Sequence, residues 1–341
     1  MTADPTNKKW LDLTAEETID PDLKICDPHH HLWDFRDASV APRYLFDEFL
    51  ADVNSGHNVV STVYVEGGSM YKAAGPREMK PVGETEFASG VAAMSASGLY
   101  GKTRVAAGII GAADLTLGDA VKPVLEAHIE AGGGRFRGIR HQLNWDASGA
   151  LPAGRTNPGQ YTSQDAGFRE GFAALAQYGL SFDVWCYHHQ IPQIVELARA
   201  YPDTAIILNH FGGPLGAGPY AGKQGEVFSV WKQAISELAE CANVVAKLGG
   251  LNLAINGFGW HLLECPPSSE TLMKTTRHYY EHAIDRFGVQ RCMFESDFPP
   301  DMVACSYNVL WNSFKRLSAD YSSSEKADLF HDTASRTYQL D

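Results

Sequence analysis

The stretch Ile25-Cys26-Asp27-Pro28-His29-His30-His31-Leu32-Trp33-Asp34 decides how the rest of the chain is interpreted. In it, a short apolar segment runs directly into three histidines flanked by aspartates. If the segment is a strand, side chains two residues apart share a face, so His29 and His31 project together while His30 points away. Neutral imidazole is the commonest protein ligand for zinc and similar ions. A solvated His-rich turn is the competing interpretation, and the choice depends on the other strands.

Three further apolar runs end in groups that bind metals or transfer protons. They are residues 182–187 before His188-His189-Gln190, residues 205–208 before Asn209-His210, and residues 291–294 before Glu295-Ser296-Asp297. A lone histidine after a strand is more often structural than a ligand. Four such endings in one chain favour a shared site, because the carboxyl ends of the strands in a parallel α/β barrel form one rim where active sites are built.

Strand-like and helix-like segments alternate along the chain, which predicts parallel α/β architecture. Eight strands are expected, the number that closes a (β/α)8 TIM barrel, near residues 23–28, 59–65, 104–110, 136–141, 181–187, 204–209, 243–248 and 291–295. Periodicity and terminators predict helices over 119–131, 191–200 and 269–287. We expect one barrel domain over 23–341 after an N-terminal extension over 1–22.

Three long connections follow predicted strands, at residues 67–103, 143–164 and 249–269. Each should therefore lie on the carboxyl-terminal rim of the barrel. Long loops inside a compact domain are usually binding loops or lids, although plain surface decoration is the alternative for each.

The composition is that of a globular enzyme. The chain has 341 residues, 44% of them hydrophobic, and a formal net charge of −13. The acidic excess argues against a nucleic-acid partner, which usually needs a basic face. The six cysteines form no C-x-x-C pair, which favours a reducing compartment over a disulfide framework. Residues 1–22 show no signal core and no apolar run could span a bilayer, so we expect a cytoplasmic protein without a membrane partner.

Six motifs, in this order, resemble those of the amidohydrolase superfamily, in the lactonase-like branch called amidohydrolase family 2. They are Asp27-Pro28-His29-His30-His31-Leu32-Trp33, Phe136-Arg137-Gly138-Ile139-Arg140-His141, His189-Gln190-Ile191-Pro192, Asn209-His210-Phe211-Gly212-Gly213-Pro214, Val245-Ala246-Lys247-Leu248-Gly249-Gly250 and Glu295-Ser296-Asp297-Phe298-Pro299. Singly each motif is weak, but six in the correct order at predicted strand ends are specific. The resemblance extends from Lys24 to the C-terminus.

The resemblance implies one divalent metal ion, zinc being the first expectation, bound by His29, His31, His189 and Asp297. Asp297 would also act as general base, and His210 would face the metal-bound water. The lysine that is carbamylated in two-metal members has no counterpart here, so one ion is expected. Some lactonases of this group keep these groups and work without metal, so a metal-free variant stays open.

Five side chains are expected to bind substrate, namely Arg140, Glu66, Trp33, Tyr187 and His261. The planar fork of Arg140 suits a substrate carboxylate, although an ion pair with Glu66 is about equally open. Glu66 could be an extra metal ligand, a proton shuttle or an ion-pair partner of an arginine, and the sequence leaves these three roles open. The aromatic residues are open as pocket lining or as simple packing.

The leading hypothesis is a metal-dependent hydrolase of a small lactone or related carboxylic acid derivative, in which Asp297 takes a proton from metal-activated water. A non-oxidative decarboxylase of a small aromatic acid and a metal-independent lactonase are the enzyme alternatives. A non-catalytic barrel that binds a partner is the third class. A lactonase should release one proton per turnover, whereas a decarboxylase should evolve carbon dioxide. The expected partners are a carboxylate-bearing small molecule and a second copy of the chain in a homo-oligomer.

Overall fold

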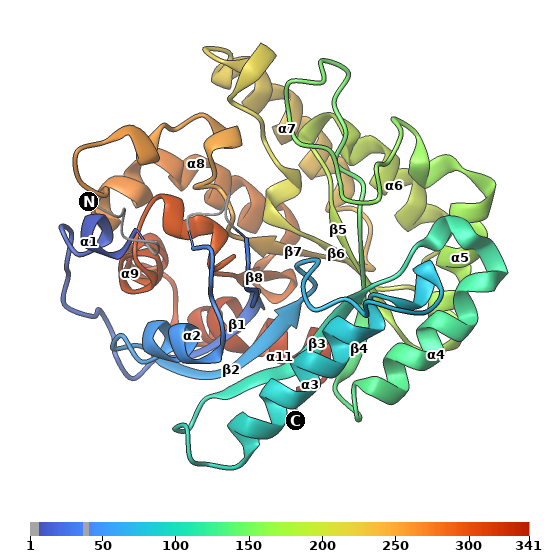
Figure 1. The fold of residues 1–341 in the computed structure, drawn as a ribbon. Coiled ribbons are helices and arrows are strands. Elements are labelled where there is room, and N and C mark those ends of the chain that lie inside the picture. Colours follow the sequence, from blue (N-terminus) through green and yellow to red (C-terminus); the bar gives the residue numbers. More distant parts are fainter. Residues whose placement is uncertain (1–6, 37–40, 341) are drawn as a thin grey trace.

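The computed structural model describes residues 7–36 and 41–340, and its centre is an eight-stranded parallel sheet (Figure 1). The strands pair in chain order and are β1 (Lys24–His30), β2 (Asn58–Val65), β3 (Arg104–Ala112), β4 (Phe136–Gln142), β5 (Ser181–Trp185), β6 (Ile206–Leu208), β7 (Val244–Leu248) and β8 (Cys292–Phe294). The backbone N–H of His31 donates to Phe298 O at 2.8 Å, and that of Asp297 donates to His29 O at 3.0 Å. These bonds join the segment after β8 to β1. The predicted (β/α)8 barrel is therefore confirmed.

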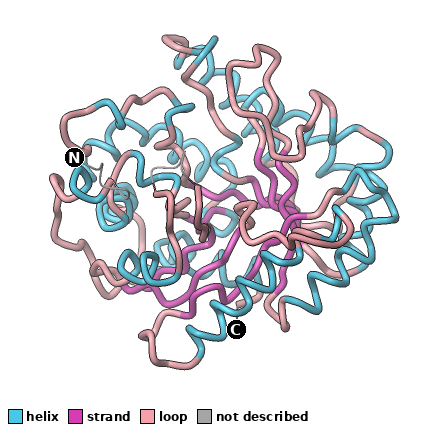
Figure 2. The backbone as a smooth tube through the Cα atoms, in the orientation of Figure 1, coloured by secondary structure: helices cyan, strands magenta, loops and turns pink. Residues whose placement is uncertain are grey.

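Helices surround this sheet, as the separate colours of helix and strand make clear (Figure 2). They are α1 (Lys8–Leu11), α2 (Phe46–Val53), α3 (Val82–Ala96), α4 (Lys122–Ala131), α5 (Ala166–Gln177), α6 (Ile191–Ala200), α7 (Gln224–Leu238), α8 (Ser269–Phe287), α9 (Tyr307–Leu317), α10 (Ser323–Ala327) and α11 (Thr333–Tyr338). Helix α6 has Pro192 in its first turn, where the missing N–H costs nothing. Helix α8 is capped by Ser268, whose side chain accepts from Thr271 N, and ends at Gly288 with φ 77°.

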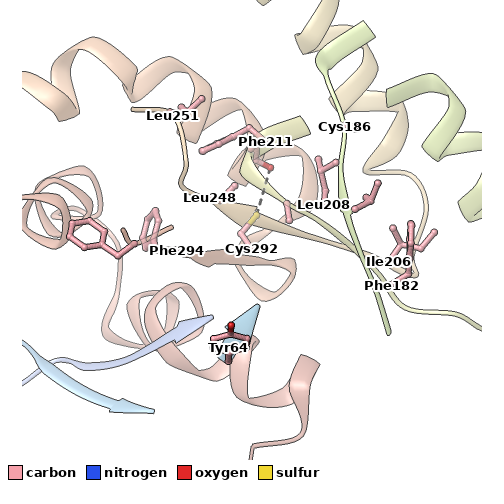
Figure 3. Close-up of a cluster of buried hydrophobic side chains, with 14 of the residues drawn as sticks. Tyr64, Phe182, Cys186, Ile206, Leu208, Phe211, Leu248, Leu251, Cys292 and Phe294 are labelled. Carbon is pink, nitrogen blue, oxygen red and sulfur yellow. Dashed lines mark hydrogen bonds between the residues drawn. The ribbon is translucent and has the colours of Figure 1, made fainter. Parts of the chain in front are cut away.

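The strands are buried on both faces, as parallel strands covered by helices must be. Strand β3 is buried from Val105 to Gly111. A Cβ added at Gly111 would lie only 3.0 Å from the His128 ring of α4, so the glycine lets helix and strand pack closely. The main hydrophobic core lies between sheet and helices. Figure 3 shows part of it, including Phe182, Leu208 and Phe294, each with no exposed surface.

The N-terminal segment packs against the helices that follow β7 and β8. Lys315 Nζ in α9 donates to the backbone oxygens of Ile19 and Asp20, both at 2.8 Å. The Glu16 carboxylate accepts from Ser269 N at the start of α8 at 2.8 Å. The division into an extension over 1–22 and a domain over 23–341 stays a prediction. All six cysteines are free. Within residues 7–36 and 41–340, no helix is long and apolar enough to cross a membrane.

Candidate active site

Three ligand atoms converge where β1 ends beside the segment after β8. The Nε2 atoms of His29 and His31 are 3.2 Å apart. Asp297 Oδ1 lies 3.4 Å from His31 Nε2 and 3.6 Å from His29 Nε2. Zinc binds such ligands tetrahedrally at about 2.0–2.1 Å, which places neighbouring ligand atoms about 3.3 Å apart. The three atoms therefore fit a single small divalent ion.

A hydrogen bond in one histidine and an ion-pair contact in the other favour the tautomer that a metal needs. His31 Nδ1 lies 2.7 Å from the carbonyl oxygen of Val65, which can only accept a hydrogen bond. His29 Nδ1 lies 2.7 Å from Glu295 Oε2 and 3.4 Å from Lys247 Nζ. In His31 the proton therefore belongs on Nδ1, and the nearer Glu295 carboxylate favours the same tautomer in His29, with each Nε2 lone pair facing Asp297. Such outer partners orient metal-binding histidines and raise their basicity.

Glu295 bridges two histidines and was not among the residues predicted for the site. Its Oε1 accepts from His210 N at 3.1 Å and from His210 Nδ1 at 2.8 Å, while its Oε2 faces His29. A Cβ at Gly249 would lie 2.5 Å from Glu295 Cγ, so this glycine leaves room for the carboxylate. One signal was present in the sequence, since Glu295 precedes Asp297 by two residues at a strand end.

His210 completes the centre on the other side of Asp297. Its Nε2 lies 3.7 Å from Asp297 Oδ1, and its ring packs edge-on against Trp185 at 4.8 Å. His210 and Asp297 both have φ of 52°, in the left-handed region that non-glycine residues seldom adopt. Such conformations cost of order 1–3 kcal/mol each and cluster at active sites. The fold therefore holds both candidate proton-transfer groups in place against local strain.

Burial dominates the electrostatics of this centre. It raises the pKa of Asp297 to about 8, with added repulsion from Asp301 and Glu295 that opposes the attraction of His210. Burial also lowers the pKa of His29 and of His31 well below its ordinary value. Both rings are therefore neutral, as a metal ligand must be. A bound cation would favour ionised Asp297.

His210 behaves differently from the two histidines of β1. Burial alone would lower the pKa of His210, but the carboxylates of Asp297 and Glu295 outweigh it and raise the pKa. His210 therefore holds its proton more tightly than a free imidazole, which suits a residue that hands a proton to substrate.

Arg140 and Glu66 form a buried ion pair, which was one of the roles left open for each. Arg140 Nε donates to Glu66 Oε1 at 2.8 Å, and Nη2 donates to the backbone oxygen of Glu66. Arg140 Nη1 lies 3.1 Å from His29 Nε2. Arg155 and Gln142 donate to the same Glu66 carboxylate. Two of the three guanidinium nitrogens of Arg140 donate to Glu66, which leaves Nη1 beside the centre and little of the planar fork for a substrate carboxylate.

The structure does not bring His189 to the proposed metal ligands. Among the described residues, the ligand atoms of His189 join no group that converges on one point. The turn after β5 carries its ring outward, where Nε2 lies 3.0 Å from Trp145 O and the ring stacks on Tyr220 at 6.3 Å. Trp185, the last residue of β5, lines the cavity instead. The ligand set that the geometry supports is therefore His29, His31 and Asp297.

The other predicted substrate-binding residues lie in different places. Trp33 lines the cavity and stacks on the His31 ring at 5.9 Å. Tyr187 is buried, and its hydroxyl donates to Pro152 O at 2.6 Å, so it fastens the loop after β4. His261 is exposed on the short helix Trp260–Leu262 and lines neither cavity described below.

Two adjoining cavities open beside the centre. The smaller, of about 160 Å³, is lined by His31, Trp33, Arg36, Gly67, Arg140, Gln142, Arg155, Trp185, His210, Leu253, Asp297 and Pro300. A larger one of about 540 Å³ lies beyond it and shares Arg140, Gln142 and Arg155 with the first. The smaller cavity contains the candidate proton-transfer groups, so substrate would react there.

Comparisons with known proteins find relatives that cover most of this chain. The uncharacterized protein y4mH of Sinorhizobium fredii is 34% identical over 337 residues, covering 94% of this chain and 99% of that protein. L-fucono-1,5-lactonase of Burkholderia multivorans is 28% identical over 240 residues, covering 70% and 73%. An amidohydrolase from Burkholderia multivorans with bound zinc superposes with a TM-score of 0.70 at 25% identity, covering 93% and 99%. A family model described as amidohydrolase matches residues 26–340, and the chain therefore belongs to the amidohydrolase family.

Proposed function

We propose that this chain hydrolyses a small lactone or related carboxylic ester with the help of one divalent metal ion, zinc being the first candidate. The observation that carries the proposal is the convergence of His29, His31 and Asp297 within 3.2–3.6 Å, with both histidines fixed as neutral ligands. A relative named lactonase and a structural neighbour with bound zinc support it.

His29, His31 and Asp297 would hold the ion. When bound, such an ion makes water a stronger nucleophile and polarises the carbonyl that water attacks. Asp297 lines the cavity, is 2% exposed, and is the nearest carboxylate to accept the proton that the attacking water loses. Burial of this group keeps bulk water away from the proton.

His210 is the second proton-transfer group. Its Nδ1 proton is held by Glu295, so Nε2 is the atom that faces Asp297 and the cavity. When the acyl C–O bond of the lactone breaks, the ring oxygen leaves as an alcohol and needs a proton. Protonated His210 is placed to donate it, and Asp297 is placed to return the proton of water to His210.

The test is a lactone screen with a pH indicator on zinc-loaded protein. Hydrolysis at neutral pH should release one proton per turnover, with L-fucono-1,5-lactone and D-glucono-1,5-lactone as first substrates. Asp297→Asn should lower turnover by about 10²–10⁴-fold, whereas Asp52→Asn, which changes a half-buried carboxylate that accepts from Tyr44 and lines neither cavity, should not. Turnover of aromatic acids with evolved carbon dioxide, and no lactone hydrolysis, would replace this proposal with a decarboxylase.

A further inference from the structure

Three guanidinium groups line the smaller cavity, against one carboxylate. They are Arg36, Arg140 and Arg155, and the carboxylate is Asp297. Asp297 belongs to the proposed metal site, where its negative charge would be balanced by the metal ion rather than by an arginine. Arg140 is committed to Glu66. Arg36 and Arg155 therefore determine the charge that a substrate meets in this cavity.

Arg36 is a half-buried cation without a carboxylate partner in the described part of the chain. Its Nη2 donates to Gly67 O at 2.6 Å. Its guanidinium carbon lies 4.0 Å above the Trp33 ring, which holds the group flat against one wall of the cavity. Burial, followed by the charge of Arg155, lowers the pKa of Arg36. Arg36 thus keeps donors free beside a second positive charge.

Arg155 reaches the cavity from the long loop after β4. Its Nη2 donates to Glu66, and among the described residues its other guanidinium nitrogens have no hydrogen-bond partner. Its side chain is 43% exposed, against 4% for Arg140. A Cβ at Gly68 would lie 2.7 Å from Arg155 Nε, so the missing side chain leaves the space that Arg155 occupies. Two adjacent glycines therefore position the arginines. Gly67 accepts a hydrogen bond from Arg36 through its carbonyl oxygen, and Gly68 leaves the space that Arg155 fills.

Glu66 cannot balance these charges alone. One carboxylate pairs with Arg140 and Arg155, and Arg36 adds a third cation, so three guanidinium groups line the wall against the single carboxylate that they contact. The Glu84 carboxylate also acts on Arg36 and Arg155, but it accepts from the backbone N–H groups of residues 67–69 and lines neither cavity. Like charges held together repel each other, and an anion between them relieves that repulsion. Two guanidinium groups with free donors match the planar geometry of a carboxylate.

We propose that Arg36 and Arg155 together bind a carboxylate of the substrate, one that is distinct from the ester carbonyl attacked at the His–Asp centre. This inference rests on the proposed lactone hydrolysis for the identity of the substrate class. It assigns the recognition of the anion to two residues outside the strands, and leaves Arg140 to position Glu66.

A matched pair of lactones tests the proposal. D-glucaro-1,4-lactone carries a carboxylate where D-glucono-1,4-lactone carries a hydroxymethyl group. Wild type should prefer the anionic lactone. Arg155→Gln and Arg36→Gln should each lower kcat/KM for the anionic lactone by about 10- to 100-fold, mainly through KM, because a charge-assisted bond is lost. The neutral lactone should change by less than about threefold. Arg43→Gln, which removes a cation from a surface ion pair, serves as the control.

Binding measurements separate this proposal from the proposed reaction. Calorimetry with both lactones on Asp297→Asn protein reports recognition without turnover. If neither lactone is hydrolysed, but the anionic one binds more tightly and each arginine variant removes that preference, the reaction is wrong and the anion site stands. If both lactones are hydrolysed and the variants affect them equally or not at all, the anion site is wrong and the hydrolase stands. A wild type without preference for the anionic lactone in binding also overturns the anion site. Arg36→Gln does not touch Glu66, so it remains informative should Arg155→Gln fold poorly.

Discussion

Glu295→Gln should weaken zinc binding although it removes none of the three proposed ligands. The carboxylate contacts two histidine rings, since Oε1 accepts from His210 N and Nδ1 and Oε2 lies 2.7 Å from His29 Nδ1. A glutamine amide offers one acceptor oxygen and one NH2 donor. The oxygen should settle opposite His210, because two N–H groups point at Oε1. The NH2 group then faces His29 Nδ1.

The consequence follows from the chemistry of imidazole. His29 Nδ1 must give up its proton to accept from the amide, and the proton moves to Nε2, the atom that would bind the ion. Loss of an outer partner of this kind costs about 10- to 100-fold in metal affinity, or roughly 1.4–2.8 kcal/mol. The side chain is fully buried, so solvent offers no replacement acceptor.

Zinc titration of metal-stripped protein against a chromophoric chelator measures the effect. The wild type, Glu295→Gln and the control Asp52→Asn should be compared at equal folded fraction, checked by circular dichroism and thermal unfolding. A zinc Kd for Glu295→Gln within twofold of wild type would refute the reasoning, because His29 would then bind the ion without its outer partner.

The remaining predictions concern catalysis, stability and pH. Asp297→Asn should lower kcat by about 10²–10⁴-fold in steady-state assays with an unchanged circular dichroism spectrum, and near-normal kcat would move the base role to His210. Arg140→Met should lower the free energy of unfolding in urea by about 3 kcal/mol, because it removes one partner of a buried ion pair. A change below about 0.5 kcal/mol would mean that Arg155 alone is a sufficient ion-pair partner for Glu66. Burial lowers the pKa of His128 to about 4 from 6.5. The unfolded chain therefore binds more protons between these values, and stability falls as the pH falls from 6.5 towards 4. This group contributes a loss of about 2 kcal/mol by pH 5. The stability gap between wild type and His128→Gln should narrow by that amount on acidification, and a constant gap would contradict the assignment.

Much of the barrel was predictable because its local signals agree with the global fold. The helices expected over 191–200 and 269–287 are found at those bounds, since Pro192 opens one and Gly288 closes the other. The expected strand near 204–209 is shorter, at Ile206–Leu208, and the expected strand near 291–295 spans Cys292–Phe294. Short strands carry little periodicity, and neighbouring backbones determine where their pairing stops.

The convergence of the candidate ligands from β1 and β8 was predictable, whereas the position of His189 was not. His29, His31 and Asp297 lie directly at strand ends that meet, so alternation and rim geometry suffice to group them. His189 lies four residues beyond the end of β5, inside the short helix His188–Gln190. The direction of its side chain depends on that turn and on Trp145 and Tyr220, which are distant in sequence. A motif fixes the order of residues along the chain but not the rotation of a loop.

Only the contacts in the structure could show which arginine pairs with Glu66 and which keeps donors free for a substrate. From sequence, Arg140 was about equally open as a receptor for a substrate carboxylate and as an ion-pair partner of Glu66. In the barrel, Glu66 at the end of β2 faces Arg140 and accepts from two of its nitrogens, and only the contacts could decide between the two roles. Arg36 and Arg155 follow no strand pattern, yet Gly67 and Gly68 bring both to the cavity. The net charge around the cavity thus depends on which carboxylates form ion pairs with which cations. Glu295 contacts His29 and His210, and Glu66 pairs with both Arg140 and Arg155. The remaining donors of Arg36 and Arg155 face the space that the substrate would enter.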